Sequence, residues 1–393
     1  MPQALQVISD KRKPGQVTYT TRHMAVLALS YCWAMSRSNR YFFDVYGNRR
    51  AIQRLAGLEV DHMPSQATFE YTLPRFDAAS VARCNARLIQ RMRRNKVFKG
   101  PVVAAIDAKE IRVPNDTYEN CGVRKSNSRP THFYKAIVLS LVGTNVPRLI
   151  LGIALDNSAN ELNAAKKIIR QVVALYGKRF IDVIVADRLY IDHKLINELK
   201  LEYGIDMVVE PKTGTEVLEE GLSLLDHEEP TPTTDRFKDD SIFQFREVSD
   251  VKHAWNGLDV PRLRFIEAHQ LAPWPDRRGK RTRRTRHILT TQQYGTASWV
   301  HQCLRDRWWI EDCNWDLEHR FRLEHLPSKS EAGIVAYLQF LAMAYSLFQC
   351  YLFRHIGGFE ALGITLTSYC DIFVRSLWAL DEDDVLPLVY DTS

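Results

Sequence analysis

Runs of apolar residues between positions 101 and 212 predict a sheet interrupted by helices. Each run is short, rich in Val and Ile, and bounded by turn residues such as G-T-N at 143–145, which is typical of strands in a buried sheet. The second and third runs are close enough in sequence for an antiparallel meander. Strands are expected at about 101–107, 131–142, 147–156, 180–187 and 205–212, with helices at 160–176 and 191–203.

Residues 1–100 have a different pattern, in which apolar positions recur at helical spacing, as from Met24 to Tyr31. We therefore expect a mostly helical N-terminal region. Its end is strongly basic, and this face either grips DNA phosphates or is a solvated amphipathic helix. The basic positions are Arg83, Arg87, Arg91, Arg93, Arg94, Lys96 and Lys99.

Residues 213–295 break the pattern and predict a β-rich insertion with a basic loop. So many cations in one loop repel one another unless a polyanion is bound, so nucleic acid is the expected partner and a solubilising loop the alternative. Trp255 and Trp274 lie in the same insertion, where they either stack on a flipped base or pack internally. The basic residues are Arg277, Arg278, Lys280, Arg281, Arg283, Arg284 and Arg286.

The chain returns to helical spacing over 296–356, and a helical tail is expected over 357–393. Residues 334–353 carry no charge and are long enough to cross a bilayer. Gln339, Ser346 and Gln349 interrupt this run, and it stands alone. We therefore expect a buried helix that backs the sheet, and no membrane.

Composition narrows the function classes. The 393 residues are enough for one large elaborated domain or two to three smaller ones. Seven cysteines without a C-x-x-C pair, and no apolar signal segment at the N-terminus, indicate a cytoplasmic protein. No phosphate-binding glycine loop, dinucleotide fingerprint, zinc-protease motif or serine-hydrolase elbow is present, so those enzyme classes lose their main support.

Three carboxylates carry the candidate chemistry. Asp107 and Asp187 each end an apolar run predicted as a strand, and Glu311 lies on a helix predicted over 305–318. Arg307 precedes Glu311 by one helical turn, so the two share a face. Because Mg²⁺ prefers a few carboxylates together with water and phosphate oxygens, the three residues are predicted to bind Mg²⁺ for phosphodiester chemistry.

The order of three antiparallel strands, helix, strand, helix and strand is that of a ribonuclease-H-like α/β domain. The contexts A-I-D-A-K, V-A-D-R-L-Y and R-D-R-W-W-I-E resemble the DDE transposases of bacterial insertion sequences, over roughly residues 100 to 350. The most similar branch has a β-strand insertion before its last catalytic glutamate, and a Tyr-x2-Arg-x3-Glu-x6-Lys signature around that glutamate.

This resemblance implies a specific activity. Asp107, Asp187 and Glu311 would be the metal-binding catalytic triad, and Arg307 the signature arginine that contacts DNA. The implied reaction is nicking and strand transfer at transposon ends with Mg²⁺ or Mn²⁺. The implied partners are double-stranded DNA at the inverted repeats, target DNA, and a second copy of the chain on DNA.

Two positions depart from the signature. Leu304 stands in place of the tyrosine, and Glu318 in place of the lysine, which reverses a charge. Arg322, one turn beyond Glu318, is expected to pair with it or to reach DNA. Two alternatives therefore stay open: a transposase-derived DNA-binding protein without catalysis, and a ribonuclease-H-like nuclease without strand transfer.

Overall fold

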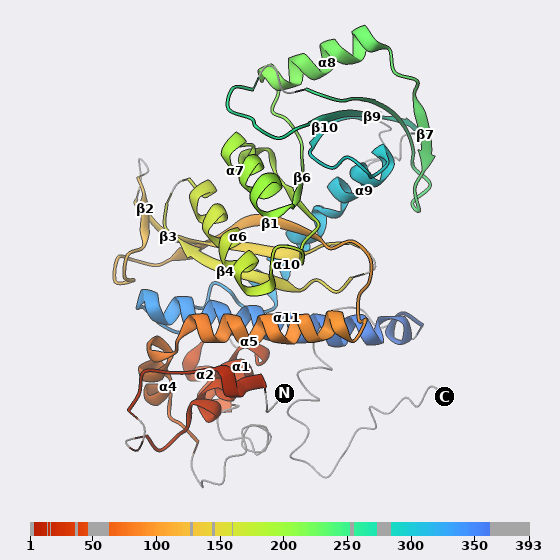
Figure 1. Ribbon diagram of the computed structural model, residues 1–393. Helices are drawn as coiled ribbons and strands as arrows, with labels where there is room; N and C mark the ends of the chain where they lie inside the picture. Colours follow the sequence, from red (N-terminus) through yellow and green to blue (C-terminus); the bar gives the residue numbers. More distant parts are fainter. Residues whose placement is uncertain are drawn as a thin grey trace.

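The computed structural model describes residues 4–361 apart from short gaps (Figure 1). The gaps are residues 14, 16, 36–37, 46–62, 126–128, 144–145, 159, 252–254 and 273–283.

A single mixed sheet runs through the described part of the chain. Its strand order is β2-β3-β1-β5-β6-β10-β9-β8-β7, with β4 also paired to β3. The pairs β1–β3 and β3–β4 are antiparallel, whereas β1–β5 and β5–β6 are parallel. This arrangement confirms the ribonuclease-H-like fold. The strands are β1 (Val103–Val113), β2 (Gly122–Arg124), β3 (Thr131–Leu141), β4 (Ile150–Asp156), β5 (Val183–Ala186), β6 (Asp206–Val209), β7 (Thr233–Arg236), β8 (Ile242–Val248), β9 (Arg264–Ala272) and β10 (Thr285–Thr290).

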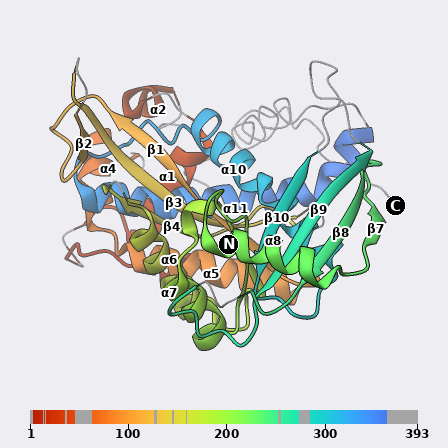
Figure 2. The same cartoon turned by 90° about the horizontal axis from the view of Figure 1, so that it is seen from above.

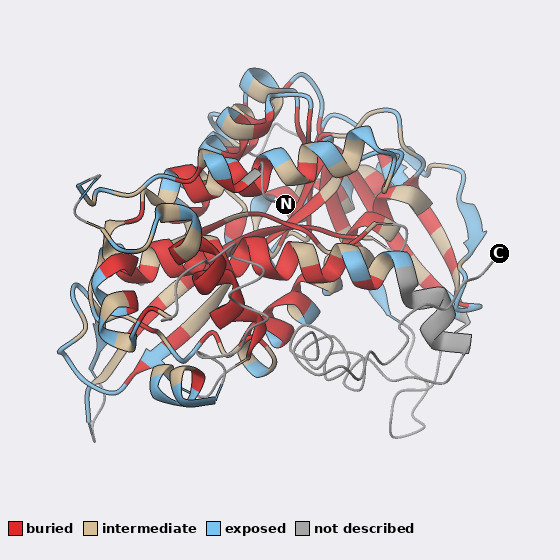
Figure 3. Ribbon diagram, turned by 90° about the horizontal axis from the view of Figure 1, so that it is seen from below, coloured by how far each residue is buried: buried red, intermediate tan, exposed pale blue. Residues whose placement is uncertain are grey.

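Helices cover both faces of this sheet, and buried residues gather where sheet and helices meet (Figure 3). One apolar cluster joins a face of the sheet to α10, α11 and the N-terminal helices, and a second joins the other face to α6 and α7. The helices are η1 (Ala4–Val7), α1 (Thr21–Trp33), α2 (Asn39–Val45), α4 (Gln66–Thr72), η2 (Leu73–Arg75), α5 (Ala78–Arg94), α6 (Leu162–Tyr176), η3 (Arg188–Tyr190), α7 (His193–Asn197), η4 (Glu198–Tyr203), α8 (Glu216–Glu228), α9 (Ala297–Asp306), α10 (Trp308–His319) and α11 (Glu331–Ala361).

The long apolar run forms α11, which lies between the sheet and the N-terminal helices in Figure 1. Within the described residues, it is the one helix whose length and apolarity would suffice to cross a membrane. The candidate span is Glu331–Arg354, and 78% of its most apolar window is buried inside the protein. Gln339 donates to the carbonyl of Ile153, and Ser346 accepts from the amide of Ile150. These bonds satisfy backbone groups of β4, as expected of a core helix that backs a sheet.

The insertion continues the core sheet. β10 pairs antiparallel with β6, and β9, β8 and β7 follow in order, so the two parts share one sheet (Figure 2). α8 packs closely on this extension, because a Cβ on Gly221 would lie 2.5 Å from the ring of Phe265. Residues 213–295 contain strands β7 to β10 together with α8, a helix that the sequence pattern did not indicate.

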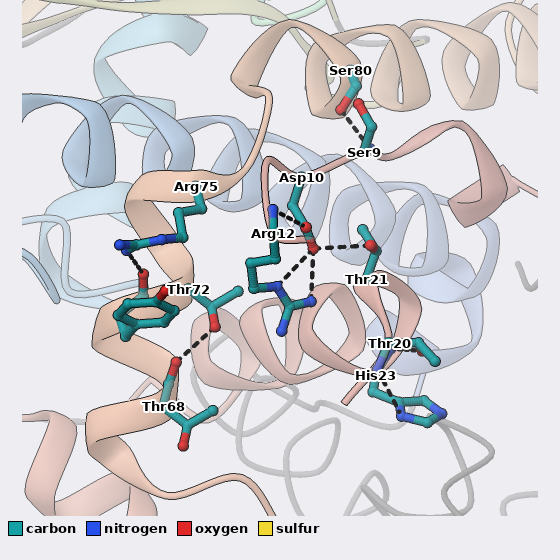
Figure 4. Close-up of polar contacts among 11 residues, drawn as sticks. Ser9, Asp10, Arg12, Thr20, Thr21, His23, Thr68, Thr72, Arg75 and Ser80 are labelled. Atoms are coloured by element: carbon teal, nitrogen blue, oxygen red, sulfur yellow. Dashed lines mark hydrogen bonds and ion pairs between the residues drawn. The ribbon is translucent and has the colours of Figure 1, made fainter. Parts of the chain in front are cut away.

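A buried polar network ties the N-terminal segment to the helices (Figure 4). Asp10 accepts hydrogen bonds from Arg12 at 2.7 Å and from the hydroxyl of Thr21 at 2.9 Å. The amide of Ser9 donates to the hydroxyl of Ser80 on α5. Burial alone would raise the pKa of Asp10, but these hydrogen bonds outweigh it and lower the pKa. The segment is thus fixed against α1 and α5 by paired polar groups.

Candidate active site

Asp107 on β1 and Asp187 just after β5 occupy neighbouring positions. In the parallel register of β1 with β5, Ile106 pairs with Ala186, and an aspartate follows each of these two residues. Side chains alternate along a strand, and adjacent strands lie about 4.8 Å apart. Asp107 therefore faces the same side as Ala105, which packs in the cluster that includes α10. The sequence placed Asp107 at a strand end, but β1 continues to Val113, and this part of the prediction was wrong.

Glu311 reaches this face on the first turn of α10. The helix predicted over 305–318 is divided in the structure, because α9 ends at Asp306 and α10 begins at Trp308. Arg307 stands at the junction, and its guanidinium donates to Glu311 Oε1 at 2.8 Å. The Arg307 side chain is 20% exposed and that of Glu311 36%, so the pair is accessible from solvent. Arginine and glutamate thus share a face, as their spacing predicted.

Asn314 joins α10 directly to Asp107. Its Nδ2 donates to Asp107 Oδ2 at 2.8 Å, from a position one turn after Glu311. Burial raises the pKa of Asp107 to about 6, and the negative charges of Glu161 and Glu311 act in the same direction. A hydrogen bond from the backbone amide of Ala108 and the charge of the Arg307 guanidinium partly offset this rise. Negative charge is therefore concentrated around a buried carboxyl group.

A second contact between β1 and α10 involves the reversed charge at position 318. Lys109 Nζ lies 2.5 Å from Glu318 Oε2, and both side chains are about a quarter exposed, at 28% and 24%. Lys109 follows Asp107 by two positions, so the two point to the same face of β1. The family signature has a lysine where this chain has Glu318. A cation therefore does lie beside this position, but it is Lys109 of β1 and not a residue of α10.

The donor chemistry of this face suits a hard divalent cation, because all three candidate ligands offer carboxylate oxygens. The raised pKa of Asp107 reflects its burial first and the neighbouring negative charges of Glu161 and Glu311 second. Within the described residues, no group of three or more His, Cys, Asp and Glu side chains is gathered closely enough to hold a metal ion. Glu311 is bonded to Arg307, and Asp187 accepts from the amide of Arg188 at 2.7 Å. Mg²⁺ needs only one or two carboxylates beside water and phosphate oxygens, so the adjacent Asp107 and Asp187 suit it while Glu311 stays bonded to Arg307.

Comparison with known families decides the class. The model of the family described as transposase DDE domain matches residues 98–347, which include all three carboxylates. The chain belongs to the DDE transposase family. Among solved structures, it is similar to piggyBac transposase in a cryo-EM synaptic complex with hairpin DNA, at 11% sequence identity and a TM-score of 0.40. That likeness covers 94% of this chain and 74% of that chain. No curated protein sequence matches the chain.

One of the arginines predicted to bind DNA, Arg286, lies beside Asp187. Arg286 and Asp187 line the same cavity of about 320 Å³, between the end of β5 and β10. Arg286 also lies 3.6 Å from Glu210. Arg284 immediately precedes β10 and is exposed. The remaining basic-loop residues, Arg277, Arg278, Lys280, Arg281 and Arg283, lie outside the described residues, as does Trp274.

Arg322 is not where helical spacing put it. α10 ends at His319, and Arg322 follows with a positive φ of 55°. The partner of Glu318 is Lys109, with His319 a further 3.5 Å contact, so the predicted pairing with Arg322 was wrong, and contact of Arg322 with DNA stays a prediction. The physical reason is the end of the helix, after which a spacing of four residues no longer means a shared face.

The tryptophans near the site differ in how far they are buried. Trp255 is partly buried and packs against the cluster around α6 and α7, which favours its packing role over base stacking. Trp308 and Trp315 are 63% and 47% exposed on α10. Only Trp309 of the three residues near Glu311 packs against the core. An exposed indole therefore stands immediately beside Arg307.

Sequence reasoning missed Asn314 and Lys109. Signals for both were present in the spacing, since Asn314 lies three residues after Glu311 on a helix and Lys109 two residues after Asp107 on a strand. Neither residue is distinctive without the register that brings β1 and α10 together.

Proposed function

We propose that this protein is a transposase that binds transposon-end DNA and carries out divalent-metal-dependent phosphodiester hydrolysis and strand transfer. The observation that carries the proposal is the adjacency of Asp107 and Asp187 in the β1–β5 register, with α10 anchored to Asp107 through Asn314. Membership of the DDE transposase family supports the same activity. The bacterial insertion-sequence branch, a cytoplasmic location and assembly of two copies on DNA are part of this proposal.

Asp107, Asp187 and Glu311 would hold Mg²⁺, or Mn²⁺ in its place. Bound divalent cations would activate the attacking water or 3′-hydroxyl and stabilise the leaving oxygen. Arg307 holds Glu311 on the accessible side of α10 and is released to a DNA phosphate when Glu311 turns toward the aspartates. Arg286 offers a second phosphate contact beside Asp187. Trp308 presents an exposed ring to DNA bases next to these contacts.

The alternative of a non-catalytic relict rested on the charge reversal at Glu318. The contact between Lys109 and Glu318 brings a cation to the same place, which weakens this argument against activity. The nuclease without strand transfer differs only in its last step. It is distinguished by whether cleaved DNA ends join to a target.

The test uses the DNA that flanks the reading frame, with its inverted repeats, and a supercoiled target plasmid. With Mg²⁺, the wild-type protein is expected to nick the repeat ends and join them to the plasmid. Asp107→Ala, Asp187→Ala and Glu311→Ala each remove one ligand and are expected to abolish both steps while retaining most DNA binding. Asp182→Ala is the matched control, because Asp182 precedes the same strand, β5, at its opposite end and accepts from the amide of Val102.

Cleavage by any of the three alanine variants at the wild-type rate would contradict the assignment of that carboxylate. Binding of the repeat DNA without metal-dependent cleavage would support the relict instead. Cleavage without joined products would support the nuclease.

A further inference from the structure

The side-chain amide of Asn314 has a hydrogen-bond partner for its nitrogen but none for its oxygen among the described residues. Asn314 lies on α10 and is 6% exposed, and its Nδ2 donates to Asp107 Oδ2. Its Oδ1 is buried and has no hydrogen-bond partner among the described residues. A buried acceptor without a partner costs free energy, so such an oxygen calls for an explanation.

The position of this oxygen follows from the bond that the amide makes. An amide oxygen and nitrogen are roughly 2.3 Å apart, by standard bond lengths. Since Nδ2 lies 2.8 Å from Asp107 Oδ2, Oδ1 is within about 5 Å of the same carboxylate. The assignment of the two amide atoms is chemically fixed, because an ionised carboxylate accepts only from the NH₂ group. The unsatisfied oxygen therefore lies close to the Asp107 carboxylate.

A second buried asparagine shows what a purely structural role looks like. Asn85 on α5 is 4% exposed, and its Nδ2 donates to the backbone carbonyl of Ile150. Its Oδ1 also lacks a hydrogen-bond partner in the described part of the chain. The group that Asn85 holds is a backbone carbonyl of β4, whereas the group that Asn314 holds is a candidate metal ligand.

We infer that Asn314 is a positioning residue for a hydrated divalent cation. Nδ2 fixes the orientation of Asp107, and Oδ1 accepts a hydrogen bond from a water molecule of the hydrated ion. Mg²⁺ and Mn²⁺ sites favour such a partner, because Mg²⁺ retains several of its waters when bound. Groups that orient ligands in this way typically alter metal affinity or activity by 10- to 100-fold. This inference rests on the proposed function, since it assumes that the carboxylates bind the ion.

The experiment measures Mn²⁺ binding to the full-length protein in the absence of DNA, by calorimetric titration and by the shift in melting temperature that Mn²⁺ causes. Asn314→Ala is expected to weaken Mn²⁺ binding by about 10-fold, because it removes both hydrogen bonds. Asn314→Asp is expected to melt earlier than wild type without metal and to show a larger Mn²⁺-induced shift. The added carboxylate repels Asp107 until a cation is bound.

The matched controls are Asn85→Ala and Asn85→Asp. Both lose the bond to β4 and are expected to melt earlier, with Mn²⁺ affinity unchanged from wild type. Asp107→Ala marks the site itself and is expected to lose the Mn²⁺-induced shift.

The outcomes separate this inference from the proposed function. If Asp107→Ala loses the shift while both Asn314 variants keep the wild-type affinity and shift, the role of Asn314 is wrong and the carboxylate site stands. If the Asn85 variants weaken Mn²⁺ binding as much as the Asn314 variants, the effect is general destabilisation and the inference also fails. If the wild type and Asp107→Ala respond equally to Mn²⁺, the carboxylate site proposed above is itself contradicted. Should Asn314→Ala not fold, the shift of Asn314→Asp decides alone.

Discussion

At the scale of single residues, the contact between Lys109 and Glu318 changes the meaning of the signature around Glu311. Along the chain, a glutamate in the lysine position reverses a charge. In space, Lys109 Nζ sits 2.5 Å from that glutamate, on the same face of β1 as Asp107. The local charge is therefore balanced by a cation from another element. If this cation serves DNA phosphate, exchanging the two charges should preserve its function.

We predict that Lys109→Glu, which places two carboxylates side by side, lowers the rate of repeat-end nicking by on the order of 100-fold. That magnitude is typical of losing one electrostatic contact in a catalytic site. The double variant Lys109→Glu with Glu318→Lys restores an opposite pair and is expected to recover at least about 10-fold of the loss, by the same electrostatic argument. The measurement is the single-turnover nicking rate at fixed salt.

Arg124 and Glu110 provide the control for this charge exchange. They form an ion pair at 2.6 Å between β2 and β1, and the Arg124 side chain is 55% exposed. Arg124→Glu with Glu110→Arg is expected to leave the nicking rate within about 2-fold of wild type, because exposed pairs contribute little. A double variant at 109 and 318 that stays as slow as Lys109→Glu would show that the cation must come from the strand.

At the scale of elements, the sequence predicted which segments form strands better than where functional side chains meet. Continuous apolar runs identify β1 and β5 because β5 and the Ala104–Ile106 part of β1 are buried on both faces. The register that aligns Asp107 with Asp187 depends on hydrogen bonds between segments about 80 residues apart, which periodicity does not encode. The end of α10 at His319 depends on the positive φ of Arg322, for which no glycine or proline gave a signal.

α9 packs against the insertion through a histidine that must stay neutral. His301 is fully buried, its ring lies 4.5 Å from that of Phe243, and neither ring nitrogen has a hydrogen-bond partner among the described residues. Burial lowers the pKa of His301 to about 3, and the positive charges of Arg286 and Arg305 act in the same direction. This packing therefore depends on pH.

We predict that His301 makes the protein less stable in mild acid. The folded state has the lower pKa, so between about pH 6.5 and pH 3 the unfolded state binds the extra proton and stability falls as pH falls. From pH 7.5 to pH 5.5 the contribution of His301 amounts to about 1.4 kcal/mol of lost unfolding free energy. The measurement is urea unfolding at both pH values, with His301→Phe as the variant that cannot titrate. Equal losses in wild type and His301→Phe would contradict this role.

At the scale of the whole molecule, the insertion and the catalytic core are one continuous sheet. β10 pairs with β6, and the buried side chains of β8, β9 and β10 share a cluster with α9 and with Val183 and Val185 of β5. The shared sheet consequently fixes the position of Arg286 on β10 relative to Asp187, which follows β5. The insertion at 213–295 thus brings Arg286 from its own β-hairpin to the cavity that Asp187 lines, although the two residues are far apart along the chain.

This placement predicts how Arg286 acts on DNA binding. If Arg286 contacts a phosphate, Arg286→Ala should weaken binding of repeat and unrelated duplexes alike, and reduce the slope of log affinity against log salt by about 1. Arg170→Ala is the matched control, because Arg170 is bonded to Glu198 on the α6 side of the sheet and should leave the slope unchanged. The measurement is fluorescence anisotropy of labelled duplexes across a series of salt concentrations.

An unchanged slope for Arg286→Ala would mean that Arg286 pairs only with its neighbour Glu210, 3.6 Å away, and that other residues bind the phosphates. A loss confined to the repeat duplex would instead indicate base readout, because phosphate contacts carry no sequence information.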